Sequence, residues 1–157
     1  MKLIRAAAMV LTAVMLGGCF FGSASTGDDR ADLVSGDLVG VWQNNAGDTL
    51  TFEQNGQFAA NNLPYEEFED FPGALPGDFD PVRDKLPASG SWEVAASRED
   101  PSGPRNRVKL YVKELAGRPA AVGAEMWAEK QDQSVVLAFY IGDPDLRDRR
   151  LFQKTPR

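Results

Sequence analysis

Histidine is absent from this 157-residue chain, and cysteine occurs once, at Cys19. Without histidine, no imidazole can act as a general base, complete a Ser-His-Asp triad or bind a metal ion. With one cysteine, no disulfide can form within the chain, so the folded domain depends on packing. A Gly-rich phosphate loop and a Gly-x-Ser-x-Gly nucleophile elbow are also missing. These absences lead us to expect a protein that is not an enzyme and that carries no cofactor and no metal.

Basic residues are outnumbered, with 17 Lys and Arg against 23 Asp and Glu and a formal net charge of −6. Nucleic acids and anionic membrane surfaces are bound by clustered cations. We therefore expect no nucleic acid partner and no polybasic contact with lipid headgroups.

The chain also has no apolar run long enough to span a bilayer. Its longest run, Ala6–Leu16, follows Lys2 and Arg5, an order typical of an export signal. The run ends in Leu16-Gly17-Gly18-Cys19, which resembles the lipobox of bacterial lipoproteins. The alternative interpretation is an ordinary signal peptide followed by an unmodified cysteine.

The lipobox resemblance implies that residues 1–18 are removed and that Cys19 is acylated, for example with palmitate. Each buried methylene contributes about 0.8 kcal/mol, so two or three acyl chains anchor a protein effectively permanently. We expect a lipid anchor on the extracytoplasmic face of the cell membrane or outer membrane. Residues 19–36 hold few large apolar side chains, so we predict a flexible tether there and a folded domain over residues 37–157.

Apolar and polar residues alternate with a period of two in eight short segments of this domain, as in β-strands with one buried face. The predicted strands are Leu38–Gln43, Thr49–Glu53, a third from Gln57, Gly90–Val94, Arg107–Lys113, Glu125–Lys130, Val135–Ile141 and Arg149–Lys154. Turns at Asn45–Asp48 and Asn55–Gly56 join the first three as hairpins. A turn through Gly117, Pro119 and Gly123 precedes the sixth.

Eight short antiparallel strands can form a sandwich or close into a barrel, and closure removes the exposed sheet edges. We therefore favour an all-β fold, an eight-stranded antiparallel up-and-down barrel. Gly40-Val41-Trp42 on the first strand, with Arg149 or Arg150 on the last, is similar to the lipocalin and wider calycin pattern. The resemblance implies that Gly40 bends the strand and that one of these arginines packs on Trp42 and closes the barrel.

One long connection interrupts the strands. Residues 64–87 contain five prolines and seven acidic residues and separate the third strand from the fourth. A connection of this length is often functional. We predict that it folds back over the domain, with one short helical turn, and that its aromatic side chains contact a partner: Tyr65, Phe68, Phe71 and Phe79.

Large aromatic side chains fall on the inward face of the strands, at Trp42, Phe52, Phe58, Trp92, Phe139 and Phe152. An eight-stranded barrel is just wide enough either to be packed with side chains or to hold one small ligand. The aromatics therefore have two interpretations: they line a site for an apolar ligand, or they fill the barrel.

Two functions remain open. The first is a membrane-anchored protein that binds a small apolar molecule inside a lipocalin-like barrel. The second is a packed module of the cell envelope that binds a protein through the acidic loop 64–87. A hydrolase with paired carboxylates is a third, weaker hypothesis. Two acidic clusters, Glu66–Asp80 and Asp143–Asp148, lack the ligand spacing of a calcium loop, so we interpret them as solvated turns.

Overall fold

The computed structural model describes residues 29–98, 100–143 and 148–156. The predicted signal peptide, Cys19 and the first part of the tether lie outside these residues. The described elements are α1 (Ser35–Leu38), β1 (Gly40–Gln43), β2 (Thr49–Phe52), β3 (Gln57–Ala60), the 3-10 turn η1 (Tyr65–Glu67), β4 (Ala88–Ala95), β5 (Arg107–Leu115), β6 (Arg118–Gln131), β7 (Ser134–Tyr140) and β8 (Arg149–Lys154). Neither described helix is long and apolar enough to cross a membrane.

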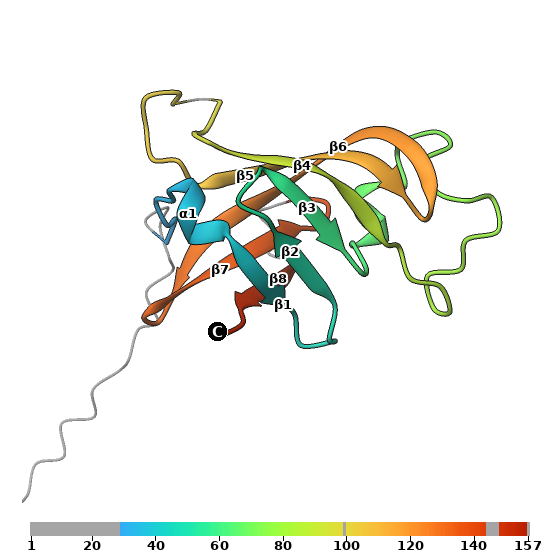
Figure 1. Cartoon of the computed structure of the whole chain (residues 1–157), viewed down its shortest axis with the longest axis horizontal. Coiled ribbons are helices and arrows are strands. Elements are labelled where there is room, and N and C mark those ends of the chain that lie inside the picture. Colours follow the sequence, from blue (N-terminus) through green and yellow to red (C-terminus); the bar gives the residue numbers. More distant parts are fainter. Residues whose placement is uncertain (1–28, 99, 144–147, 157) are drawn as a thin grey trace, which may run out of the picture.

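The eight strands form a closed barrel in which each strand pairs with its neighbour in the sequence (Figure 1). The seam between the first and last strands is short: Trp42 pairs with Lys154 and Gln43 pairs with Gln153. The amide of Thr155 extends the seam by donating to the carbonyl of Val41 at 2.8 Å. The prediction of an up-and-down barrel is therefore confirmed.

The strands occupy the predicted positions, with one marked difference. β6 begins at Arg118 and runs for 14 residues, so Pro119 and Gly123 lie in the strand and not in a turn. The reversal itself is confined to Ala116 and Gly117, whose φ angles are 50° and 73°, as in a tight hairpin turn. Pro119 is tolerated because it is the second residue of the strand, where the pairing with β5 is irregular.

The predicted tether is wrong for residues 30–36. Arg30 forms a β-bridge with Glu129, and the amide of Ala31 donates to the carbonyl of Ala128 at 3.0 Å. Ala31 and Leu33 are each only 2% exposed. Their spacing of two residues places both side chains on the barrel, and this buries enough apolar surface to order a segment whose composition indicates disorder.

The two ends of the barrel differ in the segments that lie over them. The closed end is covered by residues 30–38, including α1, which lies on the left in Figure 1. The mouth is the opposite end, where the β1–β2 turn and the loop 64–87 lie. At the closed end Leu38 is fully buried and its carbonyl accepts a hydrogen bond from the Trp42 indole at 2.8 Å.

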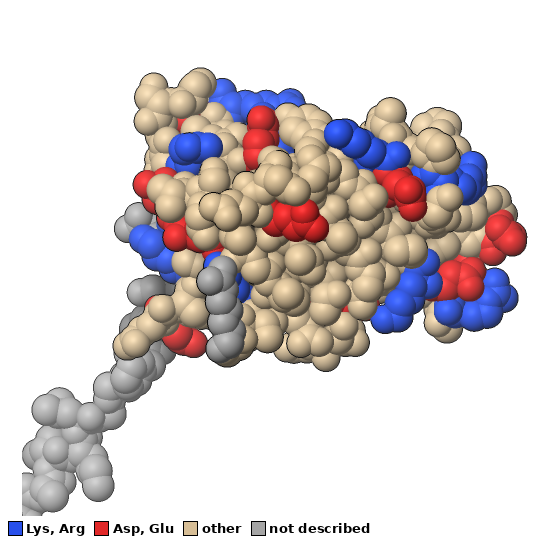
Figure 2. All heavy atoms as spheres, viewed as in Figure 1, with Lys and Arg blue, Asp and Glu red and all other residues tan. Residues whose placement is uncertain are grey.

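Charged residues are spread over the outer surface. On the face drawn in Figure 2, acidic and basic side chains are interspersed, and neither sign forms a broad patch. This face offers no continuous basic stripe of the kind that binds a nucleic acid.

Candidate functional site

The six inward aromatic side chains lie in the barrel core, and each is at most 9% exposed. Phe52 meets Trp92 edge-on with ring centroids 5.6 Å apart, and Phe139 meets Phe152 in the same way at 6.0 Å. The Trp92 indole donates to the backbone carbonyl of Gln57 at 2.9 Å. The rings of these side chains therefore already pack against one another, and the Trp92 N–H already has a hydrogen-bond acceptor within the protein.

The loop 64–87 adds to this core. Phe68, which follows η1, is fully buried, and Tyr65 and Phe79 are partly buried against the same cluster. Only Phe71 of the four predicted partner residues is exposed, at 43%. The assignment of Phe68 as a partner contact is wrong in this structure, because the barrel core already covers its ring.

The predicted closure by an arginine is also wrong. Arg149 pairs with Glu129 at 2.6 Å and Arg150 pairs with Glu66 at 3.0 Å. The cation near Trp42 is Lys154, whose Nζ lies 5.8 Å from the ring centroid. The pairing of β1 with β8 explains this, since Trp42 lies opposite Lys154. Gly40 does adopt a positive φ, 132°, which favours glycine.

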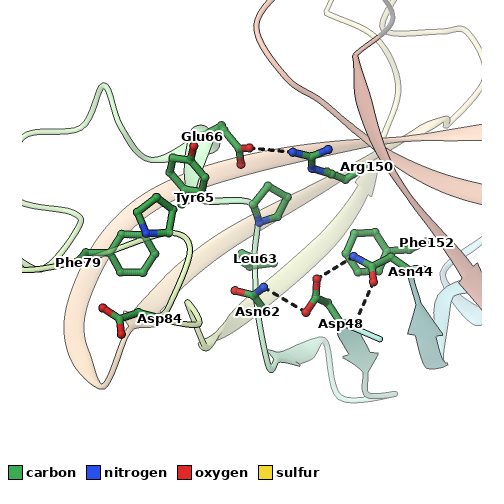
Figure 3. A pocket seen from close by; sticks show the side chains of 12 residues that line it. Asn44, Asp48, Asn62, Leu63, Tyr65, Glu66, Phe79, Asp84, Arg150 and Phe152 are labelled. Atoms are coloured by element: carbon green, nitrogen blue, oxygen red, sulfur yellow. Dashed lines mark hydrogen bonds and ion pairs between the residues drawn. The ribbon is translucent and has the colours of Figure 1, made fainter. Parts of the chain in front are cut away.

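A pocket of about 180 Å³ lies at the mouth (Figure 3). Its walls come from the β1–β2 turn, the end of β3, the loop 64–87 and β8. They are lined by Asn44, Asp48, Asn62, Leu63, Pro64, Tyr65, Glu66, Phe79, Pro81, Asp84, Arg150 and Phe152. Phe152 connects this pocket to the barrel core, because its side chain is fully buried. We call this site the mouth pocket.

Asp48 organises one wall of the mouth pocket. Its carboxylate accepts hydrogen bonds from the side-chain amides of Asn44 at 2.9 Å and Asn62 at 3.1 Å, and from Lys85 at 3.4 Å. Burial alone would raise the pKa of Asp48, but these hydrogen bonds and the Lys85 charge together lower it. Asp48 is therefore ionised at neutral pH. The side-chain oxygens of Asn44 and Asn62 do not face this carboxylate. That of Asn62 accepts a hydrogen bond from the backbone amide of Leu86 at 2.7 Å.

The other two carboxylates of the pocket also have cationic partners. Glu66 pairs with Arg150, and Asp84 accepts two hydrogen bonds from Arg83, at 3.0 and 3.1 Å. The Arg83 hydrogen bonds, followed by the backbone amide of Asp80, lower the pKa of Asp84. Each acidic group of the pocket is thus neutralised by a neighbouring cation.

Two aromatic rings of the loop complete the mouth pocket. The centroids of Tyr65 and Phe79 lie 6.1 Å apart, and the ring planes are tilted by 46°. Among the described residues, none forms a hydrogen bond with the Tyr65 hydroxyl. The pocket therefore combines aromatic surface, paired charges and one hydroxyl that is free to bind a ligand.

Three other grooves are larger but more open to solvent. One, of about 440 Å³, lies at the closed end beside Trp42, Asp37 and Lys154. Another, of about 420 Å³, includes Glu67 and Tyr111. The third, of about 330 Å³, adjoins the mouth pocket and shares Asn44 and Arg150 with it. Polar side chains from several elements also meet in the groove at Glu67, which includes Arg98, Lys109 and Glu125, so the mouth pocket is distinguished by being more enclosed.

The residue types that are missing from the sequence, histidine and a second cysteine, also limit the chemistry that is possible at the mouth. No group of three or more Cys, Asp or Glu side chains is arranged to hold a metal ion within residues 29–98, 100–143 and 148–156. The acidic stretch Asp143–Asp148 lies partly outside the described residues. The three carboxylates of the mouth pocket serve as hydrogen-bond acceptors and ion-pair partners.

Sequence reasoning missed most of the mouth pocket. Asn44, Asp48 and Asn62 have the composition of turn residues, and only folding brings Asp48 to Asn62 and Lys85. The one signal was the density of Asn and Asp at both ends of the β2–β3 hairpin. The chain matches no family model, no curated protein and no solved structure with which it was compared. The lipocalin resemblance is thus supported only at the level of an eight-stranded antiparallel barrel.

Proposed function

We propose that this protein is a non-enzymatic, lipid-anchored β-barrel that binds a small molecule in the mouth pocket, on the extracytoplasmic face of the cell membrane or outer membrane. The observation that carries the binding function is the meeting of four separate chain segments around one pocket. Ligand sites typically combine a concave surface, aromatic walls and a few convergent polar groups. The mouth pocket has all three.

The barrel interior is less suited to a ligand than the mouth. A ligand between Phe52 and Trp92, or between Phe139 and Phe152, would have to separate rings that already pack edge-on. Edge-on aromatic pairs contribute about 0.5–1.5 kcal/mol beyond the area that they bury. The small ligand that we expected inside the barrel is therefore better placed at the mouth, where it meets polar as well as aromatic groups.

The proposed anchor is supported by the sequence. Leu16-Gly17-Gly18-Cys19 after a basic and apolar leader supports acylation of Cys19. The absence of histidine and of a second thiol supports a binding protein over an enzyme.

Two experiments test this proposal. Cells that express the full chain are grown with radiolabelled palmitate, and we expect label in the wild type but not in Cys19→Ala. For the binding function, the purified full chain in detergent micelles is titrated with a library of small polar and apolar compounds. Backbone amide signals from the mouth pocket are followed by NMR. If all ligands that bind shift only signals outside the pocket, the proposed function is wrong.

A protein partner is the second candidate, and it is favoured by two exposed apolar side chains of the loop. Phe71 is 43% exposed and Val82 is 96% exposed. Contiguous exposed apolar surface often marks a contact site, so the partner role requires that one partner covers both side chains. Deleting the loop would remove Phe68 from the core, so the double variant Phe71→Ser, Val82→Ser is the better test. Envelope proteins that cross-link to the wild type but not to this variant would support the partner role, and an unchanged cross-linking pattern would contradict it.

A further inference from the structure

The mouth pocket has no uncompensated charge, and this restricts what it can bind. Its three carboxylates are each paired with a cation, Asp48 with Lys85, Glu66 with Arg150 and Asp84 with Arg83. A charged ligand would have to share its opposite charge with the partner already in one of these pairs. It would also give up its own hydration, which is costly in a partly enclosed site. A neutral ligand avoids both costs.

The pocket also offers donors and acceptors in close alternation. Carboxylate oxygens of Asp48 and Glu66 only accept hydrogen bonds, and the guanidinium of Arg150 only donates them. The Tyr65 hydroxyl can both donate and accept a hydrogen bond, and no described residue forms a hydrogen bond with it. A hydroxyl group donates and accepts at a single atom and so suits all of these neighbours without a net charge, whereas a neutral amide divides its donor and acceptor between two atoms.

The remaining surface is aromatic. The tilted rings of Tyr65 and Phe79, 6.1 Å apart, present an apolar wall beside these polar groups. A saturated ring that bears hydroxyl groups matches both surfaces of the pocket. Its C–H bonds give an apolar face for the aromatic wall, and its hydroxyls give a polar edge for the hydrogen-bonding groups. Flat aromatic compounds would pack against the wall but would have too few hydrogen-bond donors for the acceptors of the pocket.

Size sets the last limit. The mouth pocket measures about 180 Å³, which is smaller than the roughly 300–1,000 Å³ typical of pockets for drug-sized ligands. At about 30 Å³ per water molecule in the liquid, it holds about six waters. A single ring matches this space, and a second ring would extend into the adjoining groove that shares Asn44 and Arg150.

From these four features we infer that the ligand of the mouth pocket is a neutral polyhydroxylated ring of monosaccharide size. This inference rests on the proposed function, because it names the ligand class of the same site. The source of the ring, a free sugar or the terminal residue of an envelope glycan, leaves this chemistry unchanged.

The test uses the full chain in detergent micelles and equilibrium dialysis against radiolabelled compounds. The panel contains neutral hexoses and pentoses, glucosamine as a cation, glucuronate as an anion, and an apolar probe. We expect saturable binding of at least one neutral sugar and at least tenfold weaker binding of both charged sugars. Repeating the dialysis with a glycan that ends in the bound sugar distinguishes the two sources.

Matched variants locate the site. Tyr65→Phe removes one hydroxyl that has no protein partner, so the fold is unchanged and affinity for the neutral sugar falls about fivefold to tenfold. Phe79→Leu removes an aromatic face and lowers the affinity further. Val82→Ala is the control, because Val82 lies in the same loop, is 96% exposed and does not line the pocket.

Each outcome decides between the two proposals. If a charged sugar or the apolar probe binds and Tyr65→Phe weakens it, the ligand class is wrong while the mouth remains the binding site. If a neutral sugar binds equally well to Tyr65→Phe, Phe79→Leu and the wild type, the inference is overturned. If no compound of the panel binds, the ligand class is again wrong. The wider library described above then decides the proposed function separately.

Discussion

At the closed end of the barrel, apolar side chains cover the opening, whereas at the mouth the opening is bordered by ion pairs and amides. Leu33, Leu38 and Trp42 are at most 2% exposed, and only a few hydrogen bonds connect them. Asp48 at the mouth is held by three polar side chains. The closed end is therefore held together by apolar burial, and the mouth by hydrogen bonds and ion pairs.

The largest loss of stability is expected from a substitution at the closed end. Replacing Trp42 by alanine removes a buried indole and leaves the carbonyl of Leu38 without its donor. We expect the free energy of unfolding to fall by about 4–5 kcal/mol. Urea unfolding followed by circular dichroism measures this change. A loss below about 2 kcal/mol would show that the closed end contributes little to stability.

The second effect concerns the loop that forms part of the mouth. Phe68→Ala removes a fully buried ring and is expected to cost about 3–4 kcal/mol. Phe71→Ala, three residues further along, is the matched control and is expected to change stability by less than about 0.5 kcal/mol. Equal unfolding midpoints for the two variants would mean that the loop does not pack in the barrel as described.

These elements also show how far the sequence predicts the fold. The period-two alternation in Arg107–Lys113 and the Asn55-Gly56 turn are local signals, so the strands and their order could be predicted. Docking of Ala31 and Leu33 could not, because two apolar residues in a polar stretch order only against a surface made elsewhere in the chain. Composition alone therefore underestimated the ordered region.

The contacts across the barrel were predictable only in part. Gly40 and Trp42 occupy the expected place on β1, but the cation near Trp42 depends on the register of β8, and a difference of four residues replaces Arg150 by Lys154. The mouth pocket depends on contacts between residues 14 and 37 positions apart, Asp48 with Asn62 and with Lys85. No local pattern carries such information.

A third, smaller effect tests the polar network of the mouth. Asp48→Asn turns one of the two carboxylate oxygens into an amide N–H₂ group, so that the amide donor of either Asn44 or Asn62 faces another donor while the other keeps its acceptor. We expect a loss of about 1–3 kcal/mol. Chemical denaturation at pH 7 gives the value, and Asp78→Asn in the loop 64–87 serves as the exposed control. A neutral Asp48→Asn variant would mean that the network is not formed in solution.

The smallest effect depends on pH. Burial, then the nearby charges of Glu66 and Glu125, raises the pKa of Glu67 from 4.5 to about 7. The folded state therefore holds this proton more tightly than the unfolded chain, so stability is highest below pH 4.5 with respect to this group and falls as the pH rises through about 7. Because Glu67 is partly exposed, we expect a loss of only about 1–2 kcal/mol.

The variant Glu67→Gln isolates this contribution, because glutamine carries no titrating proton. The difference in unfolding free energy between the variant and the wild type is expected to grow from pH 5 to pH 8, in favour of the variant. A difference that stays constant over this range would show that Glu67 has an ordinary pKa in the folded protein.

The contrast between a packed core and a ligand-binding mouth is tested most directly by NMR of the full chain during titration with any compound that it binds. The indole N–H signals of Trp42 and Trp92 report on the closed end and the interior, and the side-chain amide signals of Asn44 and Asn62 report on the mouth. We predict that both amide signals shift to saturation while both indole signals stay in place. Saturating shifts of the indoles with unchanged amide signals would place the ligand inside the barrel and contradict the account.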